Sequence, residues 1–351
     1  MHRVISVFLG LTVVAGTLIV VSSEKWFIIW VGLETRTLAL VPLLCSKFSP
    51  RKVEASIKYF LIQALRAAIL LKGALIQAWL VGTWSVLEPL NNISSILLII
   101  AIAFKLGLSP CHFWFPDVLQ GLPFLQGLII ATWQKIAPLI ILFSFRQLIL
   151  VPLIIILGVL SVLIGGWGGL NQTQTRKILA FSSIGKMGWI TITSVYSYNA
   201  ALSMLAIYLI INTAIFLVLD FFKAPTLGHL KILAQLSPIR VLLITLSVLS
   251  LGGLPPLTGF MIKFFSLFFL IRKGFILLSS LLIMGRLLSL FFYLRISFNT
   301  SLILFPQHMI SLTSWRKMSH LVPTGKTWLV STFSVLGTIT IPLTLFLYIT
   351  I

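Results

Sequence analysis

The feature that most constrains the fold is a series of apolar runs, each about as long as a bilayer is thick. A membrane's hydrocarbon core is ~30 Å across, which an α-helix spans with about 20 residues. The runs are continuous, whereas transmembrane β-strands alternate apolar and polar residues. We therefore expect an all-α polytopic membrane protein of about 11 helices. The runs lie approximately at residues 4–21, 26–45, 57–80, 93–110, 124–145, 148–168, 178–196, 200–222, 238–268, 274–295 and 327–350.

Composition supports the membrane class. Hydrophobic residues make up 59% of the 351 residues and charged residues 9%, whereas an ordinary soluble domain carries about 25% charged residues. We expect one transmembrane domain over residues 1–351 and no soluble domain. The start, Met-His-Arg followed by an apolar run, resembles a signal peptide, but no small-residue cleavage site follows. We interpret this run as the first retained helix.

The net charge of +20 limits the partners. Nucleic acid is a common partner of such a chain, but here the basic residues are scattered through the loops between spans. We therefore expect no nucleic acid, and instead anionic lipid, such as cardiolipin, and acidic faces of neighbouring subunits. The loop charges also predict an N-terminus on the inner side and a C-terminus on the outer side.

Ionisable residues inside the apolar runs point to a function. Glu34 lies in the second run, and Lys105, Lys135 and Lys263 lie in later runs. Such a group costs at least about 2.5–3.5 kcal/mol at the bilayer centre, and it usually pairs or lines a wet pathway. Burial disfavours the charged amine, which favours proton exchange. The alternatives are an ion pair of Glu34 with Arg36 or another helix, and lysines that snorkel to the interface.

Two of the runs contain helix breakers. The fourth reads Lys105-Leu-Gly-Leu-Ser-Pro-Cys-His112, and the ninth reads Leu251-Gly-Gly-Leu-Pro-Pro-Leu-Thr-Gly-Phe-Met-Ile-Lys263. Proline removes a backbone donor and clashes with the preceding turn. Within a membrane such a break is tolerated only against protein or a water-filled cavity. A pair of interrupted helices therefore predicts a transport pathway.

Other ionisable residues leave two interpretations open. Lys186, among small residues, is either a relay or a structural donor, and His112 is either a charge switch or a hydrogen-bonded structural residue. Arg66 and Lys72, six residues apart, project from roughly opposite helix faces. One of these two therefore snorkels or faces a neighbouring chain, as Arg286 does.

No motif for a bound redox group is present. The two cysteines, Cys45 and Cys111, form no cluster, and no histidine pair has the spacing of a haem site. Neither a GxGxxG turn after a strand nor a P-loop occurs. Gly165-Gly-Trp-Gly-Gly169 lies at a run's end, which we interpret as a turn with tight packing. We expect no cofactor and no metal in this chain.

Several segments together carry a family resemblance. Residues 165–184, residues 105–116, and Gly252-Gly-Leu-Pro-Pro-Leu-Thr-Gly-Phe260 followed by Lys263 closely resemble the antiporter-like subunit 2 family of respiratory complex I, the mitochondrial NADH:ubiquinone oxidoreductase. So does Lys58-Tyr-Phe-Leu-Ile-Gln-Ala64. The resemblance runs from the second span through the tenth.

The resemblance implies a fold of inverted five-helix repeats in the mitochondrial inner membrane. It implies that the N-terminus lies in the matrix and the C-terminus in the intermembrane space. It places NADH, flavin, iron–sulfur and ubiquinone chemistry in other subunits, and makes neighbouring antiporter-like subunits the chief partners. The family's breaks map onto Pro110 and Pro255–Pro256. Its key carboxylate and lysines map onto Glu34, Lys105, Lys135 and Lys263.

The chain departs from the family pattern in three places. Thr35-Arg36 follows the key glutamate, Lys186 stands where the family commonly has histidine, and Arg66 and Lys72 add charges to the third span. We expect a proton-translocating subunit that couples NADH oxidation and ubiquinone reduction to pumping. One alternative is a stand-alone cation/proton antiporter or a subunit of one. The other is a passive scaffold between pump modules.

Overall fold

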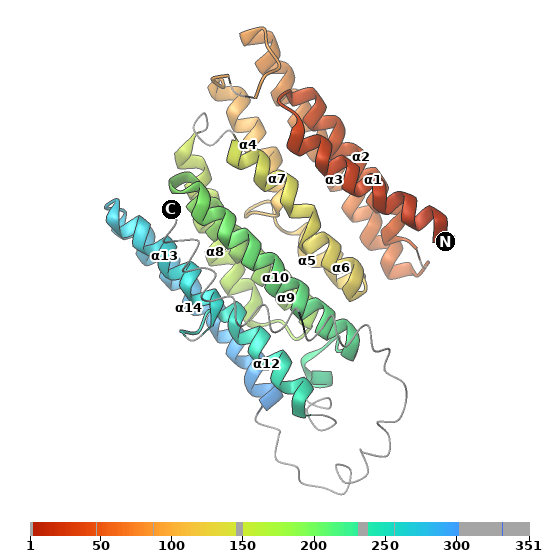
Figure 1. The fold of residues 1–351 in the computed structure, drawn as a ribbon, viewed down its shortest axis with the longest axis vertical. Coiled ribbons are helices and arrows are strands. Elements are labelled where there is room, and N and C mark those ends of the chain that lie inside the picture. Colours follow the sequence, from red (N-terminus) through yellow and green to blue (C-terminus); the bar gives the residue numbers. More distant parts are fainter. Residues whose placement is uncertain are drawn as a thin grey trace, which may run out of the picture. The chain divides into compact units, whose positions relative to one another are not determined.

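The computed structural model describes residues 3–46, 48–86, 88–144, 150–230, 238–255, 257–301 and residue 332 (Figure 1). In these ranges the chain forms helices joined by short turns, and the β-structure consists of two isolated bridges. The predicted all-α membrane class is confirmed, while the count of 11 spans stays a prediction and the span 327–350 lies outside the described residues apart from residue 332. The helices long and apolar enough to cross a bilayer are Val4–Ser22, Trp26–Leu44, Pro50–Val81, Phe124–Ser144, Val151–Leu170, Thr175–Tyr196, Tyr198–Phe221 and Ile276–Thr300.

Contacts divide the chain into two units. The first contains Met1–Val162 and Lys186–Tyr198, and the second contains Leu163–Gly185 and Asn199–Ile351. Helices α8 (Val151–Leu170) and α9 (Thr175–Tyr196) therefore each contribute to both units.

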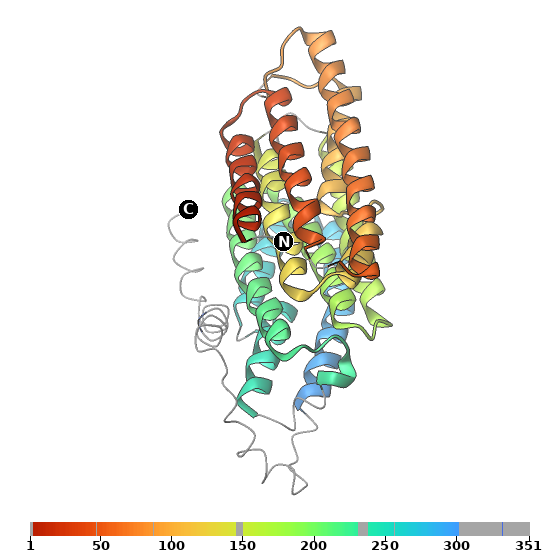
Figure 2. The same ribbon diagram turned by 90° about the vertical axis from the view of Figure 1, so that its right-hand side faces the viewer.

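In the first unit, neighbouring helices pack in sequence order. Helix α1 packs along α2, α2 along α3, and α3 along α4 (Figures 1 and 2). The start of α2 is tied to the loop after α3, because Trp26 N donates to Trp84 O at 2.9 Å. The helices are α1 (Arg3–Ser22), α2 (Trp26–Leu44), α3 (Pro50–Val81), α4 (Asn92–Leu106), α5 (Trp114–Gly121), α6 (Phe124–Ala131) and α7 (Trp133–Ser144).

Helix α3 begins seven residues before its predicted start at 57. Pro50 occupies the first turn, where its missing N–H costs nothing. Glu54 and Lys58, four residues apart, then form a surface ion pair of 2.6 Å. These polar turns lie outside an apolar window but continue the helix. The helix ends at Gly82, whose φ of 79° is left-handed.

The predicted break in the fourth run is present. Helix α4 ends at Leu106, four residues before the predicted end at 110, because Gly107 adopts a left-handed φ of 71° and caps the helix. The turn that follows contains a cis Ser109–Pro110 bond. The short helix α5 then begins at Trp114. Helix α5 was not predicted from the sequence, because its eight residues fall well below the length of a span.

The run predicted over 124–145 is present as one apolar span, Phe124–Ser144, but an interruption at Thr132 divides it into helices α6 and α7. Within α7, Pro138 has no N–H to donate to the carbonyl of Gln134, four residues earlier. Arg36 on α2 supplies that donor instead, with Nη2 3.0 Å from Gln134 O. A side chain from another helix thus satisfies the carbonyl that proline leaves open.

In the second unit, α12 packs against α14 and α13 (Figure 1). The glycine-rich segment 165–169 is part of helix α8, so its interpretation as a turn is wrong. The glycines allow neighbouring helices to approach closely, so the expected tight packing is present. A Cβ at Gly165 would lie 2.6 Å from Gly185 N, and one at Gly169 would lie 2.8 Å from the Phe292 ring. The unit's further helices are α10 (Tyr198–Phe222), α12 (Pro238–Gly252), α13 (Thr258–Arg272) and α14 (Ile276–Ser301).

The predicted break in the ninth run is also present. Gly253, with a left-handed φ of 75°, ends α12, and α13 begins at Thr258. The run predicted over 238–268 is therefore two helices, and the second continues to Arg272. The next helix, predicted over 274–295, is α14, which extends to Ser301. Its last turns are more polar than the apolar run from which the end at 295 was predicted.

Candidate functional site

The three lysines singled out by the sequence lie in the protein interior. Exposure of Lys105 is 3%, of Lys135 1% and of Lys263 8%. Lys105 is in the last turn of α4, Lys135 is in the first turn of α7, and Lys263 is in the second turn of α13. Each lysine is therefore close to an interruption between helices. The snorkelling alternative does not hold for these amines, because their side chains are enclosed by the chain itself.

Lys105 lies among charges from two other helices. Arg66 on α3 and Arg36 on α2 oppose a positive charge on its amine, and Glu34 on α2 supports one. The two guanidinium groups stay charged at every physiological pH. Burial of the amine and the two guanidinium groups therefore act against a charge on Lys105, and the Glu34 carboxylate acts for it.

The Glu34 carboxylate is half-buried and accepts a hydrogen bond of 3.2 Å from Thr37 Oγ1. The alternative of an ion pair between Glu34 and Arg36 is not formed in the described ranges, whereas Glu54 and Lys58 do form an ion pair there. Arg36 instead donates to Gln134 O. Arg36 is two residues after Glu34 on the same helix, so the two side chains project from different faces and meet different neighbours.

Arg66 and Lys72 point to different environments, as their spacing predicted. Arg66 is 1% exposed and Lys72 is exposed. Around Arg66 and Arg36 lie buried polar side chains whose atoms have no hydrogen-bond partner in the described part of the chain, namely Tyr59, Gln63 and Gln134. The sequence did not predict a role for these three residues, although the two glutamines inside apolar runs were a visible signal.

Lys135 faces an aromatic ring. Its Nζ lies 4.4 Å from the ring centroid of Phe115, which is on α5. Both side chains are 1% exposed. This distance is within the range of a cation–π interaction. Phe115 was not predicted from the sequence, because nothing local in the sequence connects α5 with α7.

Lys263 reaches back across the break that precedes it. Its Nζ donates to the carbonyls of Leu251 at 3.3 Å and Gly252 at 3.2 Å, which are at the end of α12. Arg286 on α14 donates to the next carbonyl, Gly253 O, at 2.8 Å. Arg286 is therefore bound to the break. Of the two expectations for it, snorkelling is wrong, and contact with a neighbouring chain stays a prediction. The open carbonyls at a helix end attract cationic donors.

His112 and Lys186 are the two remaining candidates from the sequence. His112 is 4% exposed in the turn after α4, with Nδ1 3.3 Å from Pro110 O and its ring tilted against that of Phe113, with centroids 4.2 Å apart. These contacts fit the structural interpretation of this histidine. Lys186 is half-buried on α9. Its role as relay or donor stays a prediction.

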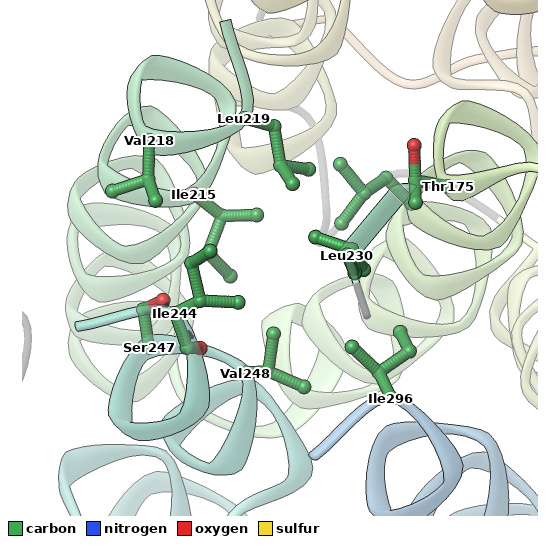
Figure 3. A pocket seen from close by; sticks show the side chains of 10 residues that line it. Thr175, Ile215, Val218, Leu219, Leu230, Ile244, Ser247, Val248 and Ile296 are labelled. Atoms are coloured by element: carbon green, nitrogen blue, oxygen red, sulfur yellow. Dashed lines mark hydrogen bonds between the residues drawn. The ribbon is translucent and has the colours of Figure 1, made fainter. Parts of the chain in front are cut away.

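The cavity shown in Figure 3 does not belong to this set of residues. It is a space of about 20 Å³ in the second unit. Its lining is apolar apart from Thr175 and Ser247, and Thr175 Oγ1 already donates to Ala224 O at 2.8 Å. No titratable side chain lines it. In the described ranges, no three His, Cys, Asp or Glu side chains gather as a metal site would require.

Comparison with known proteins identifies the family. Residues 23–289 match the family model "NADH:quinone oxidoreductase/Mrp antiporter, TM", and residues 290–348 match "NADH dehydrogenase subunit 2 C-terminus". The chain is 67% identical to NADH-ubiquinone oxidoreductase chain 2 of Strongylocentrotus purpuratus over 99% of both chains. It is 40% identical to the chain of that name in Ovis aries over 98% of both.

Solved structures show the same fold. A chain of respiratory complex I from Thermus thermophilus with bound aureothin aligns with a TM-score of 0.79 and 27% identity, over 97% of this chain and 80% of that one. A chain of the Mrp complex from Dietzia sp. aligns with a TM-score of 0.80 and 19% identity, over 97% and 75%, which shows the fold alone. The chain therefore belongs to the NADH-ubiquinone oxidoreductase chain 2 family and is a multi-pass membrane protein.

Proposed function

We propose that this chain is a proton-translocating membrane subunit of respiratory complex I. It couples electron transfer from NADH to ubiquinone, carried out by other subunits, to proton movement across the mitochondrial inner membrane. The observation that carries the proposal is the enclosure of Lys105, Lys135 and Lys263 beside interrupted helices. Family membership supplies the complex and the overall reaction.

Burial makes the charged form of an amine less favourable. Removing an ammonium group from water costs several kcal/mol, which a well-placed partner must repay. A buried lysine therefore changes its charge when its partners move, whereas an exposed lysine stays protonated. Interrupted helices supply both the movement and the polar backbone that water can reach.

The mechanism begins at the pair of Glu34 and Lys105. While the carboxylate is near, it supports the ammonium against Arg36 and Arg66. When the carboxylate withdraws, the two guanidinium groups act on Lys105 without compensation, and its proton moves on to Lys135 and then toward Lys263. Water bridges the gaps that side chains do not span. Energy from the redox subunits reaches Glu34 as a conformational or electrostatic signal.

The proposal includes the setting of the chain. We place the N-terminus in the matrix and the C-terminus in the intermembrane space, following the charge of the loops. Neighbouring antiporter-like subunits and an anionic lipid such as cardiolipin are the partners. Flavin, iron–sulfur clusters, NADH and ubiquinone bind elsewhere in the complex, and this chain binds no cofactor of its own.

Replacement of Lys105 tests the relay. In the assembled complex, Lys105→Met should lower proton translocation at least tenfold, because methionine fills the space but carries no proton. Lys105→Arg should also fail, since arginine does not release its proton. Lys58→Met is the control, because Lys58 is exposed. Quinone reduction and proton translocation are measured together, and normal pumping by Lys105→Met would refute the relay role.

A second candidate function is that of a stand-alone cation/proton antiporter or a subunit of one. The family model matched by residues 23–289, whose description names both the oxidoreductase and the Mrp antiporter, favours it. This function requires neither NADH nor quinone. Vesicles containing the chain would then show a sodium-dependent pH change with both substrates absent. Under the main proposal, no such change occurs.

A further inference from the structure

In the contact between Phe115 and Lys135, a buried amine faces an aromatic ring. The amine lies 4.4 Å from the ring centroid, and both side chains are 1% exposed. A cation–π interaction is strongest when water is excluded. The ring attracts the ammonium group through its negative face but has no atom that accepts a proton. It therefore holds the charge in place without removing the proton.

The same side chain also packs on the helix break after Lys105. A Cβ added at Gly107 would lie 3.6 Å from Phe115 Cβ and 3.8 Å from Phe115 Cγ. Gly107 is the left-handed cap of α4, two residues after Lys105. One aromatic side chain thus lies beside the cap glycine of this break and next to the amine of Lys135.

Helix α5 fixes the ring to the end of α4. Trp114 Nε1 donates to Phe104 O at 3.1 Å, which satisfies a carbonyl in the last turn of α4. Phe115 N donates to His112 O at 3.0 Å. The Trp114 and Phe115 rings meet edge to face, with centroids 5.5 Å apart. A displacement at the break would therefore be transmitted to the Phe115 ring.

We infer that Phe115 is a positioning residue that holds the Lys135 ammonium and links it to the helix break after Lys105. This inference rests on the proposed relay role of Lys135. A shift at Gly107 moves the ring relative to the amine and so changes how well the charge is held. Phe115 thereby connects the first lysine of the relay to the second without exchanging a proton itself.

An aromatic series at position 115 separates this role from simple packing. In the assembled complex, Phe115→Tyr and Phe115→Trp should keep pumping near the wild-type rate, because each retains a π face. Phe115→Leu and Phe115→Met should lower it about tenfold at unchanged assembly. Packing alone predicts the reverse order, since leucine and methionine fit a dense core better than a larger tryptophan.

Phe143→Leu is the matched control. Phe143 lies on α7, as Lys135 does, is 4% exposed, and meets the ring of Tyr198 at 5.7 Å. This control should pump normally. Failure of both non-aromatic variants at position 115 to assemble would overturn the inference, because it would show that the ring is needed for packing.

Lys135→Met, measured in parallel, separates the inference from the proposed function. Normal pumping by Lys135→Met refutes the relay itself. If Lys135→Met stops pumping while Phe115→Leu pumps as Phe143→Leu does, the relay stands and the inference fails. In the Lys135→Met background, Phe115→Leu should cause no further loss of residual activity. An additional loss would mean that Phe115 acts through other contacts, which also overturns the inference.

Discussion

The two helix interruptions use the same backbone device but place their lysines differently. Gly107 ends α4 with a φ of 71°, and Gly253 ends α12 with a φ of 75°. Lys105 comes before its break, within the helix that the glycine ends. Lys263 comes after its break and reaches back to the helix that precedes it.

The consequence is a different environment for each amine. Lys263 donates to carbonyls at the C-terminal end of α12, where the helix dipole favours a cation. Lys105 lies among the charges of Glu34, Arg36 and Arg66. Lys263 therefore contributes to the structure of its break whenever it is protonated, and one cation from another helix, Arg286, opposes its charge. Lys105 is affected by two cations and one carboxylate from other helices. Two similar motifs in the sequence thus have unequal structural roles.

The largest expected difference concerns stability. Lys263→Met removes two hydrogen bonds from a charged donor, each worth about 1.5–3 kcal/mol, so we expect a loss of about 3 kcal/mol or more. Lys105→Met removes a charge that two neighbouring cations oppose, and should cost less. Thermal unfolding of the purified complex measures both. Lys263→Arg, which keeps a donor, should recover part of the loss, and equal midpoints for the two methionine variants would contradict the comparison.

Alanine at the two cap glycines tests the breaks directly. A left-handed φ costs about 1–2 kcal/mol for a residue with a Cβ, and this cost is common to Gly107→Ala and Gly253→Ala. Only at Gly253 would the Cβ crowd its surroundings, 3.0 Å from Gly259 O and 3.3 Å from Lys263 Nζ. We expect a loss of about 2 kcal/mol there and about 1 kcal/mol at Gly107, again from unfolding midpoints. The reverse order would show that the first break is the tighter one.

The sequence predicted the features that depend on local chemistry. Apolar runs gave most helices within a few residues, and Gly107 and Gly253 end helices where glycine and proline had predicted breaks. The burial of Lys105 and Lys135 followed from the cost of an amine in an apolar run. These features need only the neighbours of a residue along the chain.

The sequence did not reveal contacts that packing creates. Arg36 donates to Gln134 O, 98 residues away, and no local pattern relates the two. The proximity of Phe115 to Lys135 depends on the direction of α5 after its turn. Arg286 was expected to snorkel or to face a neighbouring chain, because no local pattern relates it to its partner, Gly253 O, 33 residues away. The roles assigned to the relay residues stay a prediction for the variants above to test.

A smaller effect is expected at Arg286, which supports the second break from outside. Arg286→Met removes one charged hydrogen bond, to Gly253 O, and should cost about 1.5 kcal/mol. This is less than the loss at Lys263, because the lysine still caps two carbonyls. Unfolding midpoints of the single and double variants measure any coupling. If the two losses simply add, the cations act on the break independently.

The smallest expected change has the opposite sign. Arg66 is 1% exposed, and neither Nη1 nor Nη2 has a partner in the described part of the chain. An unpaired buried donor is unfavourable, and an apolar side chain of similar length removes that cost. Arg66→Met should therefore raise the free energy of unfolding by about 1 kcal/mol, and with it the unfolding midpoint.

Arg295→Met is the control for Arg66→Met, because Arg295 Nη1 donates to Leu170 O at 2.8 Å. Loss of this bond should lower the midpoint, so the two arginine variants should move in opposite directions. Arg66→Met also removes one of the two cations that oppose a charge on Lys105. It should make proton release from Lys105 less favourable and slow pumping modestly while stability rises. A fall in both stability and pumping would show that Arg66 is instead paired within the assembled complex.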